Sequence, residues 1–423
     1  MMSCTGNSNV DTPALDSIAK NGIRFERATC TNPVCVPSRF SLFTGLMPSE
    51  IGMRCNEDAQ IIPNVSNEVL NNGMGYVLQR AGYETYYGGK EHLPTFRSKD
   101  IGFEYFCRDE RDTLAAESAQ FLLKKHKKPF LLVVSFINPH DICHMAINDH
   151  REKTRGKAAE FLTNTMHRLG LRRTRIEIRN VMNLLSKSET SRLPKLPENH
   201  EPQEREPEAI RSLFKREFRG AARKKWDEKT WRQHRYLYAR LTEKVDAQIG
   251  QVLDALENGP NSENTFVIFT SDHGDHDGSH KLEHKTAVYK ESVEIPLLIK
   301  WNGAKTVGKV IKEMVSNGLD LFPTVCDLAG AEMPAGRLGK SLVHLIQQHD
   351  DNPSKNKRKW FPIECEIGRG VWSNDWAYIL YDKGTNREQL YDLKSDPGQT
   401  RNHADDHPDM IKKCRKQYET FFS

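Results

Sequence analysis

No long apolar run occurs in this chain of 423 residues, since the longest ones, 130–137 and 265–269, are only as long as a β-strand. A membrane-spanning helix needs roughly 18 to 20 apolar residues, so we expect no membrane span. The nine cysteines form no CxxC pair and show no regular spacing, so no disulfide framework is indicated, although single disulfides remain open. Internal repeats and low-complexity tracts are missing too, which leaves no sign of a repeat architecture.

A large net charge is also missing. The formal charge of +5, with 28% charged and 37% hydrophobic residues, suits a soluble globular enzyme. The charge is uneven, because residues 146–195 hold twelve Lys and Arg against five Asp and Glu. Such a patch attracts polyanions, although a solvated helix face gives the same pattern. It contains no recognisable nucleic-acid-binding module.

Helical and strand-like segments alternate along most of the chain, which predicts an α/β protein. The two longest apolar runs are typical of strands buried on both faces, and each ends in polar residues. Ligand sites of such sheets gather beyond the carboxyl ends of the strands, so His and Asp side chains should converge there. We expect helices at 11–22, 68–81 and 231–257, strands at 83–87, 130–137 and 266–269, and a first helical turn at 41–45.

Two regions depart from this alternation. Residues 146–225 read as a basic insertion over the active face, in which the Pro-rich stretch 193–207 cannot be a regular helix. From about residue 357 the pattern changes to short strands separated by turns and followed by a final helix. We therefore expect a catalytic domain at 1–356 and a small antiparallel subdomain at 357–423, with strands at 360–364, 376–381 and 389–393.

The segment 35–45 carries most of the chemical information, because it reads Cys-Val-Pro-Ser-Arg-Phe-Ser-Leu-Phe-Thr-Gly. It resembles the signature of the type I sulfatases, members of the alkaline phosphatase superfamily. The resemblance continues over nearly the whole chain. Its further landmarks are Gly89-Lys90-Glu91-His92-Leu93, Asn138-Pro139-His140-Asp141, Thr270-Ser271-Asp272-His273-Gly274, His280, Lys285, Asp320–Thr324, Leu390–Leu393 and Asp396-Pro397.

The resemblance implies an alkaline-phosphatase-like α/β sandwich, with a large mixed, mostly parallel sheet flanked by helices and a small C-terminal antiparallel sheet. It also implies hydrolysis of a sulfate ester, with Cys35 oxidised to formylglycine as the nucleophile. His92 is the expected base and Arg39 would hold the nucleophile, while His140 or Lys285 would protonate the leaving oxygen. The catalytic set is Cys35, Arg39, Lys90, His92, His140 and Lys285, and the substrate-binding set is Lys90, His140, His280 and Lys285.

Metal binding is the second implication of the resemblance. Asp272, His273 and residue 35 match ligands of the family, and Ca²⁺ is the expected ion, with Mg²⁺ or another divalent ion as alternatives. A helical zinc site made by His276, His280 and His284 is disfavoured, because neighbouring glycines weaken the helix that it requires. An EF-hand fails as well, since His residues would stand where Asp and Glu are needed.

The amino end departs from the family pattern. Family members begin with a strand that carries two adjacent metal-binding Asp residues, whereas the first carboxylate here is Asp11, at a helix start. We expect either a longer natural protein, of which this chain starts at an internal methionine, or a degenerate relative. The first is favoured because every downstream motif is intact. In both cases the sheet lacks an inner strand, and too few ligands remain for Ca²⁺.

The sequence thus predicts a sulfatase that acts on a sulfated carbohydrate or a related ester. Two alternatives remain, a phosphonate monoester or phosphodiester hydrolase of the same superfamily and a non-catalytic polyanion-binding homologue. The expected partner is a formylglycine-generating or anaerobic sulfatase-maturating enzyme, with neither nucleic acid nor membrane involved. No secretory signal is visible, although the resemblance suits a periplasmic, secreted or lysosomal location.

Overall fold

The computed structural model describes residues 1–56, 64–152, 193–215, 217–301, 307–347 and 358–423. Half of the predicted basic insertion, residues 153–192, lies outside this part. None of the described helices combines the length and apolarity that crossing a bilayer requires.

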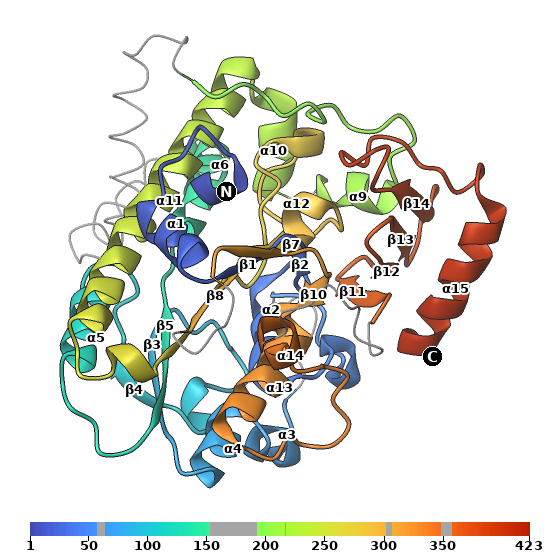
Figure 1. The fold of residues 1–423 in the computed structure, drawn as a ribbon. Coiled ribbons are helices and arrows are strands. Elements are labelled where there is room, and N and C mark those ends of the chain that lie inside the picture. The colour runs from blue at the N-terminus through green and yellow to red at the C-terminus, as the bar shows by residue number, and fades with distance from the viewer. Residues whose placement is uncertain (57–63, 153–192, 216, 302–306, 348–357) are drawn as a thin grey trace.

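The α/β class and the small C-terminal antiparallel sheet are confirmed (Figure 1). The strands of the first sheet are, in spatial order, β6 (Phe266–Thr270), β8 (Leu297–Trp301), β1 (Ile23–Phe25) and β9 (Lys309–Ile311). A second sheet holds β4 (Glu104–Cys107), β3 (Glu84–Gly89) and β5 (Phe130–Ser135), which are parallel to one another. A small third sheet holds β10 (Val315–Ser316), β2 (Ala28–Thr29) and β7 (Glu294–Ile295).

Helices cover both sides of these sheets. They are α1 (Pro13–Lys20), α2 (Cys35–Thr44), α3 (Asn67–Asn71), α4 (Met74–Arg80), α5 (Leu114–Leu122), α6 (Cys143–Glu152), α9 (Glu208–Leu213), α10 (Glu217–Lys225), α11 (Glu228–Glu257), α12 (Lys290–Val293), α13 (Asn317–Ala329), α14 (Val343–Gln347) and α15 (Pro408–Phe422). Short 3₁₀ turns are η1 (Ser3–Thr5), η2 (Pro48–Ile51), η3 (Ser98–Ile101), η4 (His140–Ile142), η6 (Ser262–Asn264) and η7 (Ser279–Lys281). The helix α11 crosses one face beside α1 and α5, whereas α2 and α13 pack together on the other (Figure 1).

Several predicted elements occur where the sequence placed them. The helix expected at 231–257 is α11, the helix expected at 11–22 is α1, and the apolar runs form β5 and β6. The stretch 193–207 is irregular, as predicted. Residues 276–284 form no α-helix, so the face required for the alternative zinc site does not exist.

Three expectations about local structure are wrong. The helix expected to start near Ser41 starts at Cys35, since Pro37 lies in its first turn, where proline is tolerated. The helix expected at 68–81 is divided into α3 and α4 at Gly73, where a side chain would lie 2.6 Å from Ile101 Cβ. The strands β5 and β6 are only half-buried along their whole length, although they were expected to be buried on both faces.

The C-terminal sheet consists of β11 (Phe361–Cys365), β12 (Gly368–Trp372), β13 (Trp376–Tyr381) and β14 (Glu388–Asp392), all antiparallel. The sequence missed β12. Glu364 on β11 ties this sheet to the main body, because its Oε1 accepts a hydrogen bond from the Ser49 N–H at 2.7 Å. Burial raises the pKa of Glu364 to about 7, although the Ser49 N–H, Arg369 and Arg54 favour its ionised form.

We predict that Glu364→Gln stabilises the protein at alkaline pH. In the unfolded chain the Glu364 carboxyl ionises near its ordinary pKa, whereas in the folded protein it stays protonated up to about pH 7. The stability of the wild type therefore falls as the pH rises from about 4.5 to about 7. The variant should gain up to about 3 kcal/mol in free energy of unfolding above about pH 8 and little below pH 4. Urea unfolding across this range measures the gain. The control is Glu419→Gln on α15, and equal pH dependence of wild type and Glu364→Gln would contradict the assignment.

Candidate active site

Cys35 is the first residue of α2 and is fully buried. Val34 before it is extended, and its carbonyl accepts the Ser38 N–H at 3.0 Å to start the helix. The positive end of the helix dipole therefore lies at Cys35 and favours a negative group there.

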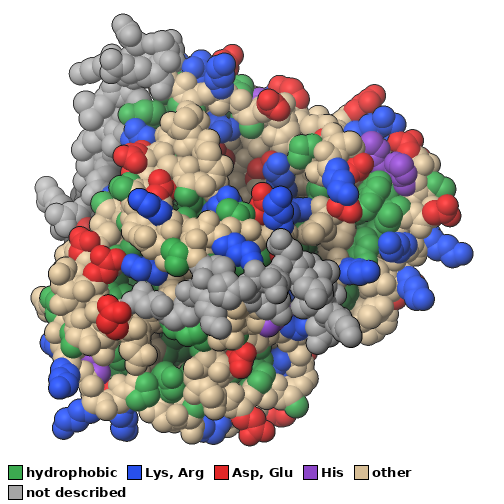
Figure 2. All heavy atoms as spheres, in the orientation of Figure 1, with side chains coloured by type: hydrophobic (Ala, Val, Ile, Leu, Met, Phe, Trp, Pro, Cys, Tyr) green, Lys and Arg blue, Asp and Glu red, His purple; other side chains and the backbone are tan. Residues whose placement is uncertain are grey.

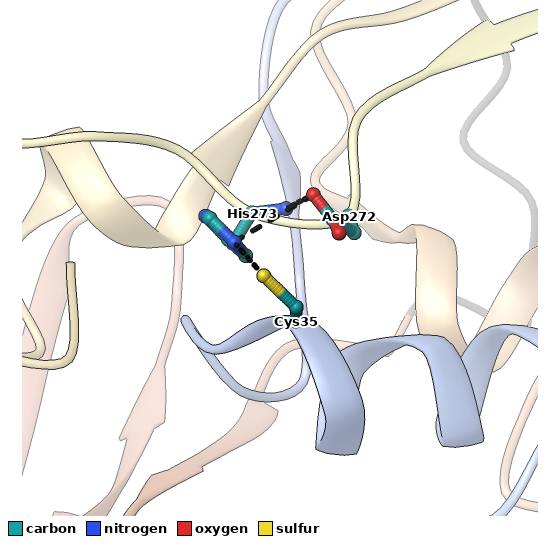
Figure 3. Close-up of side chains that lie close together, drawn as sticks. All are labelled: Cys35, Asp272 and His273. Carbon is teal, nitrogen blue, oxygen red and sulfur yellow. Dashed lines mark hydrogen bonds and ion pairs between the residues drawn. The ribbon is translucent and has the colours of Figure 1, made fainter. Parts of the chain in front are cut away.

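Three nitrogen atoms reach the Sγ of Cys35. Nε2 of His273 and Nζ of Lys285 each lie 3.1 Å away, and Nζ of Lys90 lies 3.6 Å away. Figure 3 shows the side chains of Cys35 and His273 pointing toward each other. Burial alone would raise the pKa of the Cys35 thiol, but Lys285, His273 and Lys90 together hold that pKa well below its ordinary value. Position 35 is thus suited to a negative charge.

Arg39 joins α2 to the ends of three strands. Its Nε donates to Oδ2 of Asp272 at 2.8 Å, beyond the end of β6. Its Nη1 donates to the Lys90 carbonyl at 2.9 Å and to Oγ of Ser135 at 3.0 Å, after β3 and at the end of β5. Burial would raise the pKa of Asp272, but His273 and Arg39 outweigh it and lower that pKa below its usual range. Asp272 is therefore ionised.

His140 lies beside this group, at the start of the turn η4. Burial lowers the pKa of His140 to about 4, an effect that Asp141 opposes and that Lys90 and Lys285 reinforce. The fully buried Asp141 is held by Arg111, whose Nε and Nη2 donate to its two oxygens at 3.1 and 2.8 Å. Oδ1 of Asp141 lies 3.9 Å from Nδ1 of His140. The Arg111–Asp141 pair thus fixes the turn that presents His140.

The structure does not bring His92 and His280 to Cys35. His92 is exposed, and it is not among the hydrogen-bond partners of Cys35 in the described part of the chain. The ring of His280 is fully buried and stacks on Tyr289, with ring centroids 3.8 Å apart. Their roles as base and substrate ligand stay predictions. The imidazole that contacts residue 35 is that of His273, which the sequence assigned to a metal.

Sequence reasoning missed the residues that hold this arrangement in place. Tyr87 and Ser135 both contact Arg39, and Ser38 Oγ donates to the backbone carbonyl of Asp272. Ser135 and Ser38 stand at a predicted strand end and inside the motif, so both could have been found. Arg111 does not lie in a recognised motif, and its contact with Asp141 becomes visible only in the folded structure.

The described residues do not fit a complete Ca²⁺ shell. Ligand atoms of Cys35, Asp272 and His273 lie within 4.8 Å of one another, the only such group in the described part of the chain. Calcium takes about six to eight oxygen ligands, whereas this group offers one carboxylate, which already accepts from Arg39. Nδ1 of His273 lies 2.7 Å from the Gly274 carbonyl, which leaves Nε2 facing Cys35.

The fold and this cation-lined position together define a hydrolase of the alkaline phosphatase superfamily. The family model of the sulfatases matches residues 1–331, and the model described as N-sulphoglucosamine sulphohydrolase, C-terminal, matches residues 278–420. The chain therefore belongs to the sulfatase family, and it is a sulfuric ester hydrolase. Members of this family generally depend on formylglycine and a divalent metal.

Individual relatives agree with this assignment. The Delta 4,5-hexuronate-2-O-sulfatase of Bacteroides thetaiotaomicron is 27% identical, over 95% of this chain and 81% of the relative. The solved structure of a 2-O GAG sulfatase has a TM-score of 0.78 at 24% identity and covers 97% of this chain and 86% of its own. A phosphonate monoester hydrolase of Agrobacterium radiobacter shares the fold, with a TM-score of 0.74 at 18% identity over 99% of this chain and 92% of its own.

We predict that Arg111→Met destabilises the protein by about 3 kcal/mol at neutral pH, because it leaves the buried Asp141 carboxylate without its ion-pair partner. The pKa of Asp141 is lowered in the folded state, by His140 and Arg111 against the effect of burial. The pair therefore stabilises above the ordinary carboxyl pKa, and this contribution is lost as Asp141 protonates in acid. Chemical denaturation at neutral and acid pH measures the difference.

The neighbouring Arg108→Met is the control, since Arg108 is exposed and stacks on Tyr105. If Arg111→Met were no less stable than Arg108→Met at neutral pH, the pair would not hold this turn.

Proposed function

We propose that this chain hydrolyses a sulfate ester of a carbohydrate at position 35, after oxidation of Cys35 to formylglycine. The convergence of Lys90, Lys285 and His273 on one atom of residue 35, at the amino end of a helix, carries this proposal. The distances of 3.1 and 3.6 Å from Lys285 and Lys90 suit N–H donors around a sulfur atom. The hydrated aldehyde would supply the hydroxyl oxygen that attacks sulfur.

The two lysines would bind the sulfate as point charges. Burial lowers the pKa of Lys90, whereas Cys35 and Asp272 outweigh burial at Lys285 and raise its pKa. Lys285 therefore stays charged and can bind a sulfate oxygen. Arg39 is engaged with Asp272 and the strand ends, so it acts by positioning α2 and with it residue 35.

His140 is the proposed proton donor for the sugar oxygen that leaves sulfur. It is partly exposed and lines the cavity that opens at the site. Burial, reinforced by Lys90 and Lys285, lowers the pKa of His140 to about 4. A bound sulfate would add negative charge beside it and raise that pKa toward the range in which an imidazolium donates a proton at neutral pH. We derive no step that involves a metal ion, because the described donor groups do not form a complete coordination shell.

The substrate class rests on relatives and on the walls of the site. A relative at 27% identity is named for 2-O-sulfated hexuronate. The cavity that Lys90, His140 and Lys285 line is also lined by charged and polar groups from separate parts of the chain, among them Arg235, Asn199 and Asp396, and by the apolar strands β5 and β6. Figure 2 shows Lys and Arg interspersed with Asp and Glu among the described residues of one face. A sulfated saccharide suits such mixed walls.

One experiment separates this proposal from its alternatives. The chain is expressed with a formylglycine-generating enzyme, and mass spectrometry should show loss of the thiol at Cys35. The product is then assayed on a sulfated uronate disaccharide, an aryl sulfate and an aryl phosphonate diester. We expect the sulfated disaccharide to be the best substrate. Preference for the phosphonate would indicate the phosphonate hydrolase, and an unmodified Cys35 without any turnover would favour the non-catalytic homologue.

We predict that Lys285→Met lowers kcat on the best sulfate ester by about 100- to 1,000-fold, because one charge that stabilises the developing negative oxygen is lost. The matched control is Lys412→Met on the exposed surface of α15, which should retain full activity. Steady-state kinetics of the modified enzymes measures both. An unchanged kcat in Lys285→Met would remove Lys285 from the mechanism.

A further inference from the structure

A surface loop far from residue 35 concentrates positive charge. Between α5 and β5 the chain reads Leu123-Lys-Lys-His-Lys-Lys-Pro129, and all four lysines of this stretch are exposed. We call the segment 124–128, with its four lysines, the lysine loop. On the face drawn in Figure 2, several Lys and Arg side chains lie together at the lower left, below the position of α5 in Figure 1.

The imidazole of His126 holds the lysine loop in place. Its ring stacks on that of Phe121, with centroids 4.2 Å apart, and lies 4.7 Å from the ring of Phe130. Its Nε2 also lies 2.9 Å from the backbone carbonyl oxygen of Phe121. Since the middle residue is anchored between α5 and β5, the backbone that carries the two lysine pairs is fixed before any partner binds.

The four ammonium groups are not neutralised within the described part of the chain. None of them makes an ion pair there, whereas Lys281, Lys300 and Lys394 each lie 2.6 to 3.0 Å from a carboxylate oxygen. Glu84 begins the neighbouring strand β3, but its carboxylate accepts the hydroxyl of Tyr86 at 3.2 Å. The segment 123–129 contains four lysines and no Asp or Glu, so its positive charge is unbalanced locally.

Stabilisation of a helix end explains only part of this charge. Lysines near the C-terminus of a helix offset the negative end of the helix dipole, and this effect falls off within the last turn. Lys124 and Lys125 follow α5 closely and fit such a role. Lys127 and Lys128 lie beyond His126, next to β5. Half of the cluster is therefore left without a role in helix stability.

The lysine loop lies at the opposite end of β5 from the active site. It precedes Phe130, the first residue of the strand, whereas Ser135, the last residue, contacts Arg39. A strand of this length spans about 20 Å, which exceeds the screening length of about 8 Å at physiological ionic strength. The loop therefore does not hold the sulfate that is hydrolysed at residue 35, and a partner of the loop occupies a separate site.

The side chains of the loop favour a sulfated polysaccharide over other polyanions. Lysine acts as a flexible point charge, which suits sulfate groups spaced along a polymer. Insertion into a bilayer surface needs an apolar face, and Leu123, at 54% exposure, is the only exposed large apolar residue in the segment 123–129. Single-stranded nucleic acid stacks on free aromatic rings, whereas the rings of Phe121 and Phe130 are covered by His126.

We propose that the lysine loop is a second binding site for a sulfated polysaccharide, which retains the protein on the polymer while residue 35 acts on another segment. The inference rests on the proposed function for the identity of the polymer, but the binding itself requires no turnover. Because the contact consists of exposed charges, it weakens as the salt concentration rises.

The test compares the full chain with two variants of equal net charge. The loop variant carries Lys124→Gln, Lys125→Gln, Lys127→Gln and Lys128→Gln. The control variant carries Lys383→Gln, Lys412→Gln, Lys413→Gln and Lys416→Gln, at exposed positions of the C-terminal subdomain. All three proteins are made without formylglycine formation, and their binding to immobilised heparin is measured by surface plasmon resonance at about 0.15 M salt. We expect the loop variant to bind at least about tenfold more weakly, and the control to stay within about twofold of the wild type.

Unchanged heparin binding in the loop variant would overturn the proposal, and so would an equal loss in both variants, which would show that only net charge matters. Equally tight binding of duplex DNA, or of vesicles of phosphatidylcholine and phosphatidylserine, would assign the loop to another class of partner and overturn it as well. The formylglycine forms of the wild type and the loop variant should hydrolyse a sulfated disaccharide at the same rate. Absence of turnover in both would contradict the proposed function without changing the heparin result, so the two failures are distinguishable.

Discussion

The contact on which this structure depends is the buried ion pair between Arg39 and Asp272. It joins the helix that carries residue 35 to the loop after β6, and the same guanidinium reaches the ends of β3 and β5. Buried charged groups are stable only when they are paired and fully hydrogen-bonded. Here the hydrogen-bond partners of the ion pair come from separate elements of the fold. The geometry of the site is therefore a property of the assembled sheets more than of any single motif.

Electrostatic balance explains why so many cations gather in a closed space. Lys90 and Arg39 are buried and Lys285 is half-buried, and Asp272 and the acidic thiol of Cys35 are the main negative groups that act on them. Such a site gains from an incoming anion such as a sulfate ester, because the negative charge of the substrate offsets the excess positive charge of the lysines and Arg39. Binding and catalysis thus use the same excess of positive charge.

The sequence predicted what depends on local pattern. The 3.6-residue periodicity located α11, the turn residues located α1, and the motifs located Cys35, Lys90 and Lys285 before any fold was known. Sequence-based prediction failed where contacts between distant segments determine the local structure. Gly73 divides a helix because Ile101 lies against it, Arg111 has no local signal, and the half-burial of β5 and β6 cannot be read from their continuous apolar sequences. His273 was singled out as a metal ligand, which stays a prediction, and its contact with Cys35 depends on a turn that only the tertiary structure sets.

The complete burial of Cys35 has a consequence for the proposed modification. In the finished fold Cys35 is the first residue of a packed helix and has no accessible surface. An enzyme that oxidised this side chain would therefore have to reach it before α2 docks, so the rate of docking would limit the fraction of molecules that become modified.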